Sequence, residues 1–408
     1  MKPSGVGLLA FALLLLTAAT AAAQATPPVP PEEEMDVPGL IRAWRNKDSP
    51  PPGDPQQRMI VAAPIIGSNP SAGFQLGAAA QVAVFRGDPS TTRITSGIAS
   101  VSFSTKKQVL ANVRFDSYSD GNRWFIQGDN RFQSTSQNIY GFGSATPSSA
   151  AVSTDFGFVR IHETIYRHTA GAIYLGGGFL FDSHTSVEPA EASNPAWPSS
   201  PYVLYSEQHG LPIEGQQSAG FSVNALLNRR DSDINPLSGW RASARYRASF
   251  KGFLSGDSSW QQLDVDARVY LPLEARGRHR LALWTYASVV TTGAAPYFEV
   301  PATVMDIYGR SARGYQDGRY RGERLVYGEA EYRAPLMRNG LLGLVAFATM
   351  TTVANRQTGE ALFDSVAPSA GGGLRLLLNK RSRTNLCFDF AWGKDGASGV
   401  YLALQEAF

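Results

Sequence analysis

Apolar and polar residues alternate over most of this chain, beginning near residue 58. In the segment 240–251, tryptophan, alanine, tyrosine and phenylalanine occupy the even positions, and arginine, serine and lysine occupy the odd ones. Successive side chains of a β-strand point to opposite faces, so this pattern predicts a strand with one apolar and one polar face. Sixteen segments follow the pattern and are predicted strands: 59–66, 71–85, 93–104, 108–118, 123–133, 155–168, 172–181, 217–228, 240–251, 259–271, 280–290, 325–334, 341–352, 369–378, 385–393 and 399–408.

The connections between these segments alternate between short and long. The short set carries Gly, Asp, Asn or Pro, as tight turns require, and comprises 86–92, 119–122, 169–171, 229–239, 274–279, 335–340 and 379–384. The other set includes the loops 134–154, 182–215, 292–324 and 353–368. Short periplasmic turns and long outer loops are typical of an outer-membrane barrel whose N-terminus lies in the periplasm.

The hydrophobic residues are spread through these alternating segments and are not gathered into long runs. They make up 43% of the chain, yet no run after residue 25 approaches the length of a spanning helix, which is about 20 residues. Only helices and closed barrels satisfy their backbone groups in lipid. We therefore expect an all-β fold, a transmembrane antiparallel β-barrel of about 16 strands. A soluble secreted β-sandwich or β-helix is the alternative.

The polar faces of neighbouring strands favour the barrel over the sandwich. Arg245 and Arg247 share a face with Asp264 and Asp266 of the next predicted strand. The polar face of a sandwich meets bulk water and has no need to pair its charges. Balanced charges on adjoining strands indicate a narrow, wet lumen.

The N-terminal part of the chain differs in composition from the rest. Lys2, the apolar run 6–17 and the small residues 21–25 are typical of a secretory signal peptide, which we place at 1–25. Residues 26–57 are rich in proline and charge, which predicts an extended periplasmic tail. Within this tail, 37–47 is predicted to form a short amphipathic helix. The barrel is placed at 58–408.

Several kinds of chemistry find no support in the sequence. The formal charge of +3 gives no reason to expect nucleic acid, and the single cysteine, Cys387, excludes an intrachain disulfide. No His/Cys cluster has metal-ligand spacing. Asp182, Ser183 and His184 have the residue types of a catalytic triad, but successive side chains on a strand point to opposite faces. We expect no catalytic residue, no metal, no cofactor and no enzymatic activity.

The tripeptide Arg313-Gly314-Tyr315 lies in the long polar loop 292–324, between two alternating segments. If this loop folds back into the barrel, the guanidinium meets carboxylates on the inner wall, since arginine binds carboxylates through a planar fork. The candidate partners on predicted polar faces are Glu329, Glu331 and Asp389. The alternative is a solvated loop arginine, whose exposed ion pairs contribute only about 0–1 kcal/mol.

The last predicted strand carries the chain to Phe408. Val400, Leu402, Leu404 and Phe408 share its apolar face, which we expect to meet lipid, and Glu406 interrupts that face near the rim. A charge close to the membrane interface costs only about 0–1 kcal/mol. A terminal aromatic on such a strand resembles the C-terminal signal of outer-membrane barrels, and Phe408 is the candidate for that signal.

Three features together resemble the BamA/TamA superfamily, also called the bacterial surface antigen family. They are Arg313-Gly314-Tyr315, the turn from Asp231 through Pro236 to Gly239, and the terminal Phe408. The resemblance implies an outer-membrane barrel of a Gram-negative bacterium, an inserted sixth extracellular loop, and a role in inserting or translocating other proteins. Two departures stand out. The tail 26–57 is expected to hold none of the periplasmic POTRA modules usual in the family, and Thr349 stands where the family often has aspartate.

Three functions remain open at this point. The first is assembly or translocation of proteins, which requires a weak seam between the first and last strands; Pro64 in the first strand suits such a seam. The second is a passive pore, and the third is a structural or surface-binding barrel. The expected partners are outer-membrane lipid, a separate periplasmic protein, and unfolded outer-membrane or secreted clients. The barrel itself is expected to be monomeric.

Overall fold

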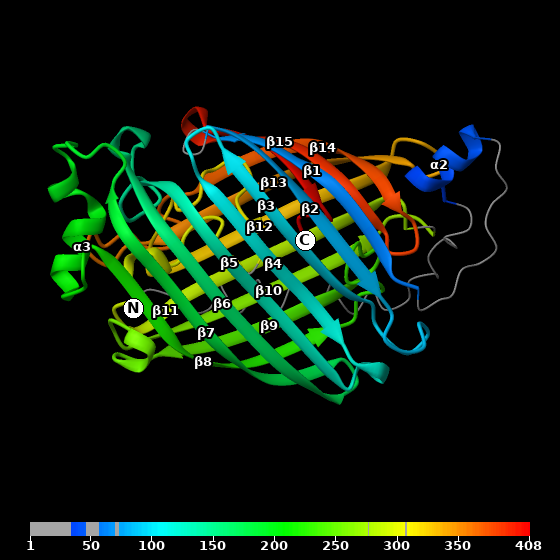
Figure 1. The fold of residues 1–408 in the computed structure, drawn as a ribbon, viewed down its shortest axis with the longest axis horizontal. Coiled ribbons are helices and arrows are strands. Elements are labelled where there is room, and N and C mark those ends of the chain that lie inside the picture. The colour runs from blue at the N-terminus through cyan, green and yellow to red at the C-terminus, as the bar shows by residue number, and fades with distance from the viewer. Residues whose placement is uncertain (1–33, 46–56, 70–72, 276, 307) are drawn as a thin grey trace.

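The computed structural model describes residues 34–45, 57–69, 73–275, 277–306 and 308–408. Within these residues, sixteen antiparallel strands form one closed barrel in which each strand pairs with its neighbours in sequence and β1 adjoins β16 (Figure 1). The strands are β1 Met59–Asn69, β2 Gly73–Val84, β3 Thr95–Ser104, β4 Val109–Tyr118, β5 Trp124–Ile139, β6 Val152–Ala170, β7 Ile173–Pro189, β8 Gly215–Asn228, β9 Gly239–Ser249, β10 Trp260–Pro272, β11 Arg280–Gly293, β12 Arg324–Pro335, β13 Leu342–Ala354, β14 Ala367–Asn379, β15 Thr384–Gly393 and β16 Ser398–Leu404. The predicted barrel of about sixteen strands is confirmed.

The helices lie at the two ends of the barrel (Figure 1). The α-helix α2, Val37–Trp44, adjoins the end with the short turns and falls within the helix predicted for the tail, whereas α3, Pro201–His209, lies at the other end. Short 3-10 helices occur at η3 Asp120–Asn122, η4 Ser148–Ala150, η5 Trp197–Ser199, η6 Phe253–Ser255, η7 Tyr297–Glu299 and η8 Lys394–Gly396. None of the helices in the described ranges is long and apolar enough to cross a bilayer. The predicted signal peptide and most of the predicted tail lie outside the described residues.

Three strands, β5, β6 and β7, exceed their predicted lengths the most. The β5–β6 ladder continues to Ile139 opposite Val152, and β7 runs to Pro189. The predicted loops 134–154 and 182–215 are therefore partly strand. Residues 134–138 are all polar. A strand that extends beyond the membrane has water on its outer face, so the alternation fades while the backbone ladder continues.

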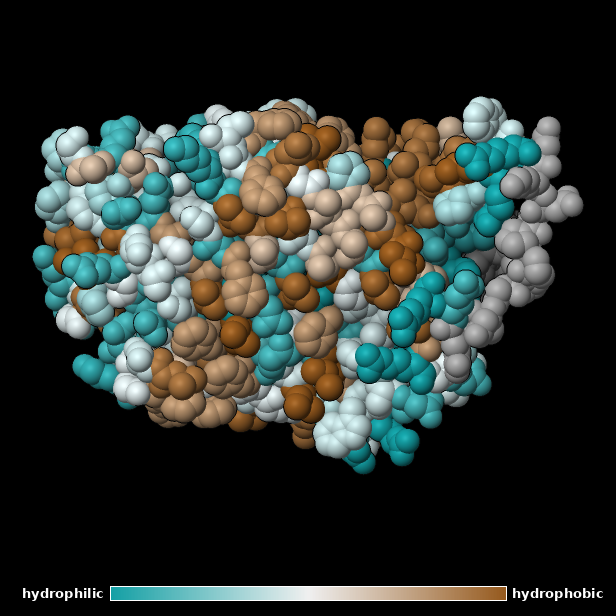
Figure 2. Space-filling view, in the orientation of Figure 1, coloured by the Kyte–Doolittle hydropathy of each residue, from teal (hydrophilic) through white to brown (hydrophobic). Residues whose placement is uncertain are grey.

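The two faces of the wall differ as the alternation predicts. On β10, Leu263 and Val265 are exposed on the outside, whereas Asp264 and Asp266 are buried toward the lumen. The lumenal charges pair: Arg245 lies 2.8 Å from Asp264, and Arg268 lies 2.8 Å from Asp266. The outer wall carries many apolar side chains (Figure 2).

The closing seam between β1 and β16 is short. Within the described residues its ladder consists of Ser68 opposite Val400, whereas the β15–β16 ladder extends from Trp392 opposite Ser398 to Leu386 opposite Leu404. Nearer the N-terminal end of β1, side-chain packing holds the two edges together, with Leu404 and Ala63 in one buried apolar cluster.

The C-terminal segment departs from the prediction. β16 ends at Leu404, and Gln405 has a left-handed φ of 70° that turns residues 405–408 into the lumen. Glu406 lies 2.7 Å from Arg375, and the Phe408 ring packs 5.2 Å from Trp284. The expectation that Phe408 and Glu406 lie on the lipid-facing side of a strand was therefore wrong. A buried acid requires a cationic partner, and Arg375 provides one on the lumenal side.

Candidate functional site: loop six in the barrel lumen

The loop between β11 and β12, residues 294–323, folds back into the barrel, and we call it loop six. The Asp306 carboxylate shapes its tip by accepting hydrogen bonds from the backbone N–H groups of Arg310 at 2.9 Å and Ser311 at 2.7 Å. Short polar side chains that bind nearby backbone groups stabilise tight turns of this kind. The turn brings Arg313 to the inner wall, where its side chain is buried.

Arg313 contacts all three candidate acids. Its Nη1 donates to Oδ2 of Asp389 at 2.7 Å, and its Nη2 donates to Glu329 and Glu331. The guanidinium also lies over the ring of Phe347, 3.5 Å from the ring centroid. Loop six is thus tied at one arginine to β12, β13 and β15.

The acids around Arg313 belong to a larger network of charges. Glu331 also binds Arg333 at 2.6 Å, and Asp389 also binds Arg375 at 2.5 Å. In contrast, Arg313 is the one cation within salt-bridge distance of Glu329 among the described residues. A buried charge is tolerated only where it is paired and hydrogen-bonded, so Glu329 depends on loop six more than the other two acids do.

The charge of Arg313 is fixed by these contacts. Burial alone would lower the pKa of Arg313, but the carboxylates of Glu329, Glu331 and Asp389 outweigh burial and raise that pKa well above its ordinary value. The guanidinium therefore stays protonated at any physiological pH. Such a group serves as a permanent electrostatic tie and cannot act as a proton donor in catalysis.

Gly314 and Tyr315 extend the tie toward the seam. Gly314 has φ of 100°, its N–H donates to the Tyr401 hydroxyl of β16 at 2.8 Å, and a Cβ added there would lie 3.1 Å from the carbonyl carbon of Trp392. The Tyr315 hydroxyl donates to the carbonyl of Pro368 and accepts from the N–H of Lys394 at 2.8 Å. The motif thus needs glycine for its backbone conformation, and tyrosine to reach β14 and the turn after β15.

Thr349 does not leave a gap where the resemblance led us to expect an aspartate. Its hydroxyl pairs with that of Ser369 at 2.6 Å, and the Ser369 hydroxyl contacts the main-chain oxygen of Arg313 at 2.5 Å. Thr349 therefore supports the Arg313 backbone through Ser369, while Asp389 of β15 supplies a carboxylate to the side chain.

A second arginine of loop six holds the C-terminal segment, and the sequence did not single it out. Arg310 donates to the main-chain oxygens of Leu404 at 2.9 Å, Gln405 at 3.0 Å and Glu406. On the other side of the segment, Arg333 donates to the main-chain oxygen of Phe408 at 2.8 Å. Residues 405–408 are thus held between loop six and the inner wall.

A second buried charge cluster lies at η7. Glu299 of loop six is 3.2 Å from Arg247 of β9 and 3.6 Å from Arg160 of β6. Both arginines also pair with Asp182 of β7, at 3.2 Å and 2.6 Å respectively. Burial, together with the Asp182 carboxylate, raises the pKa of Glu299 to about 7. The polar-face position of Arg247 was visible in the sequence, but its partner in a distant loop was not.

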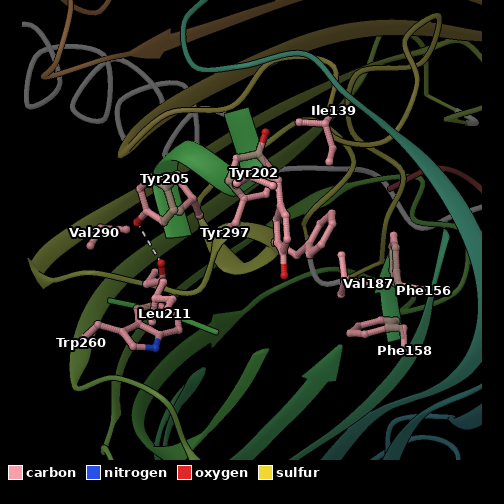
Figure 3. Packing of buried hydrophobic residues seen from close by; sticks show 14 residues of the cluster. Ile139, Phe156, Phe158, Val187, Tyr202, Tyr205, Leu211, Trp260, Val290 and Tyr297 are labelled. Atoms are coloured by element: carbon pink, nitrogen blue, oxygen red, sulfur yellow. Dashed lines mark hydrogen bonds between the residues drawn. The ribbon is translucent and has the colours of Figure 1, made fainter. Parts of the chain in front are cut away.

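Aromatic side chains cover the outer mouth of the barrel. Tyr202 and Tyr205 of α3 pack against Tyr297 and Phe298 of η7, and the Tyr205 hydroxyl donates to the carbonyl of Ala295 at 2.8 Å (Figure 3). The loop that carries α3 therefore folds over loop six and does not project freely from the barrel.

The residues of the suspected triad are separated in the structure. Asp182 pairs with His162 at 2.7 Å, whereas His184 stacks between the rings of Phe158 and Phe298, at 4.6 and 4.9 Å. No group of three or more His, Cys, Asp or Glu residues in the described part of the chain is arranged to hold a metal ion.

A cavity of about 250 Å³ remains in the lumen. Its wall includes residues 63–65 of β1, residues 402–408 at the C-terminal end, and Tyr308 and Arg310 of loop six. Much of the remaining wall comes from strands in the run from β3 to β9, so the cavity reaches from the inner side of the seam across the lumen.

Comparisons with known proteins agree with this architecture. A family model described as the Omp85 superfamily domain matches residues 99–408. The crystal structure of BamA from Haemophilus ducreyi lacking POTRA domains 1–3 is 16% identical, with a TM-score of 0.51, over 86% of this chain and 69% of that one.

Two structures of CdiB show the same degree of likeness. CdiB from Acinetobacter baumannii is 10% identical over 85% of this chain, and CdiB from Escherichia coli is 11% identical over 88%, each with a TM-score of 0.51. The chain spans 59% and 63% of these two proteins respectively. No curated protein matches the chain. On the family match over most of its length, the chain belongs to the Omp85 superfamily and is a β-barrel protein of the Gram-negative outer membrane.

Proposed function

We propose that this barrel inserts polypeptides into the outer membrane, or translocates them across it, by opening between β1 and β16. The observation that carries the proposal is the short β1–β16 ladder, which within the described residues consists of Ser68 opposite Val400. Each backbone hydrogen bond contributes about 0.5–1.5 kcal/mol net. Separating these strands thus costs far less than separating β1 from β2, whose ladder runs from Met59 to Asn69.

The geometry on both sides of the seam supports this proposal. Most of β1 presents an edge without a ladder partner in the described residues, and Pro64 within it has no N–H to donate. Unpaired strand edges accept an added strand from another chain. The lumenal cavity reaches residues 63–65 of this edge, so a client strand that pairs with β1 has space on the inner side of the wall.

The BamA/TamA resemblance supports clients of the same class, namely unfolded outer-membrane or secreted proteins. We further propose that a separate periplasmic protein delivers them. Loop six would then keep the C-terminal half of the barrel rigid while the seam opens.

Depletion of the protein tests this function. We expect the amount of at least one outer-membrane or secreted protein to fall, measured by quantitative proteomics of outer membranes and culture medium, and to recover when the wild-type chain is restored. Unchanged levels of all other outer-membrane and secreted proteins after depletion would contradict the proposal.

A cross-linked seam tests the mechanism. Ser68→Cys with Val400→Cys, in a Cys387→Ala background, joins β1 to β16 at their one described register pair. Ala403→Cys in a chain that keeps Cys387 is the matched control, because Cys387 and Ala403 face each other across the intact β15–β16 ladder. In the depletion strain, the variant with the seam link should fail to restore the levels of the affected outer-membrane or secreted proteins. The variant with the control link should restore them as the wild-type chain does. Equal restoration by both would rule out opening at the seam.

A passive pore is less well supported, because loop six is tied to the inner wall of the lumen and aromatic side chains of α3 pack over it. Planar-bilayer conductance separates the two functions. A pore predicts steady conductance of the wild-type protein, whereas a plugged barrel predicts conductance that rises strongly only after loop six is deleted.

A further inference from the structure

The hydrogen bonds that fix α2 to the barrel, among the described residues, lie at the N-terminal end of the helix. The Asp36 carboxylate caps the helix by accepting from the N–H of Gly39 at 2.8 Å, and it also accepts from the N–H of Lys380 at 3.1 Å. The N–H of Met35 donates to the carbonyl of Asn339 at 2.9 Å. The helix start is therefore docked on two short turns, one after β12 and one after β14.

No described residue covers the apolar face of α2. Positions 37, 40, 41 and 44 share this face at helical spacing, and Leu40, Ile41 and Trp44 are 47%, 44% and 81% exposed. An isolated helix of eight residues is unstable in water. An uncovered face with a leucine, an isoleucine and a tryptophan therefore needs an apolar environment.

The position of α2 identifies that environment. The turn that holds Met35 also carries the exposed residues Leu336 and Met337, and Leu374 is exposed on β14. Leu374 lies on the outward face of β14, and Leu336 and Met337 continue this apolar surface onto the turn. Figure 1 shows α2 at the end of this wall, outside the barrel.

Charge on and beside the helix fits the same surface. Arg42 and Arg45 lie on and just after α2, and the exposed Arg338 lies on the turn that docks Met35. Arginines beside an apolar helix face bind the phosphates of a lipid leaflet, and tryptophan favours the headgroup region.

We propose that α2 is an interfacial anchor whose Leu40, Ile41 and Trp44 insert into the phospholipid leaflet that faces the periplasm. The anchor holds residues 34–45 against the membrane beside β12–β14. It does not depend on the proposed function, because it rests on the outer-membrane location alone.

Lipid quenching tests the anchor in the full-length protein. Trp44→Cys is labelled with a polarity-sensitive fluorophore, since the native Cys387 is buried, and the protein is placed in phosphatidylethanolamine–phosphatidylglycerol vesicles that contain lipids with a nitroxide near the headgroup. Ala170→Cys is the matched control, because this exposed residue is the last of β6, next to the turn between β6 and β7 at the same end of the barrel.

We expect the label at position 44 to be quenched about threefold more than the label at position 170. Equal quenching at the two positions would overturn the proposal. A blue-shifted label at position 44 without lipid quenching would overturn it as well, since the face would then be covered by protein, either a second copy or a periplasmic partner.

A second measurement avoids the bulky label. Brominated lipids quench tryptophan on contact, so the wild-type protein should lose more fluorescence in brominated vesicles than Trp44→Phe does. Identical quenching of the two proteins would contradict insertion of Trp44. Heat-modifiable migration in gels confirms that every variant carries a folded barrel.

Discussion

Replacement of Arg313 by alanine removes the tie between loop six and the inner wall. Glu331 and Asp389 keep Arg333 and Arg375 as partners, but Glu329 keeps only the hydroxyl of Tyr327 among its described contacts. Loss of one partner of a buried ion pair costs about 3–5 kcal/mol, because the remaining charge is left uncompensated. We expect the free energy of unfolding to fall by that amount.

Urea unfolding of the purified protein in detergent micelles measures this change. The matched control is Arg324→Ala, an exposed arginine at the start of β12, for which we expect a change within about 0.5 kcal/mol. A loss below about 1 kcal/mol for Arg313→Ala, similar to that of an exposed ion pair, would refute the reasoning.

A double-mutant cycle identifies which acid depends on Arg313. Adding Glu329→Gln to Arg313→Ala removes the unpaired charge, so the double variant should regain about 1–3 kcal/mol relative to Arg313→Ala. Glu331→Gln or Asp389→Asn in the same background should regain less, since each leaves Arg333 or Arg375 without a carboxylate that it binds now. No coupling with any acid, or the largest coupling with Asp389, would contradict this ranking.

Three further changes test other parts of the lumen. Gly314→Ala should lower the free energy of unfolding by about 1–3 kcal/mol through backbone strain and crowding. The loss should exceed that of Gly396→Ala, because Gly396 also has a left-handed φ but no atoms lie within 4 Å of its added Cβ. Equal losses in urea unfolding would contradict this. Arg310→Ala should release residues 405–408, seen as faster proteolytic cleavage after β16 than in Arg324→Ala; unchanged cleavage would show that Arg310 does not hold the segment. Because the pKa of Glu299 is raised to about 7, its contribution to stability is present below the unfolded value near 4.5 and is lost as pH rises through 7. Glu299→Gln should flatten the fall in unfolding free energy between pH 5 and pH 8, and parallel profiles for the two proteins would contradict the assignment.

The strands could be predicted because membrane and lumen impose opposite requirements on alternate residues. The segment 240–251 shows both requirements, and β9 occupies Gly239–Ser249 within two residues of the prediction. The alternation of apolar and polar residues weakens where water lies on both faces of the wall. The outer extensions of β5, β6 and β7 were therefore not predicted. The acids near Arg313 could be predicted for a similar reason, since Glu329 and Glu331 share a polar face of one strand.

The C-terminal segment could not be predicted from alternation. Val400, Leu402, Leu404 and Phe408 have the spacing of one strand face, and only the left-handed backbone at Gln405 separates Phe408 from the others. That turn is stabilised by long-range partners, Arg310 of loop six and Arg375 of β14. The alternation of residues 399–408 does not indicate such distant partners, so the predicted strand was four residues too long at its C-terminal end.

The contacts of loop six divide the barrel unevenly. Arg313, Gly314 and Tyr315 join β12 to β16 into one cross-linked block, and Arg310 adds the C-terminal segment to it. β1, in contrast, is held through its ladder with β2 and through the cluster that contains Leu404. An opening at the seam therefore separates the β1 edge from a rigid partner, and the two sides can be tested independently.

Loss of Arg313 weakens the block without changing the seam ladder, whereas the link between positions 68 and 400 closes the seam without changing the Arg313 contacts. If the function requires a rigid lumen, the Arg313 variant should insert or translocate its clients less efficiently. If the function requires the wall to open, the variant cross-linked between positions 68 and 400 should lose this activity, even though its barrel is at least as stable as that of the wild type.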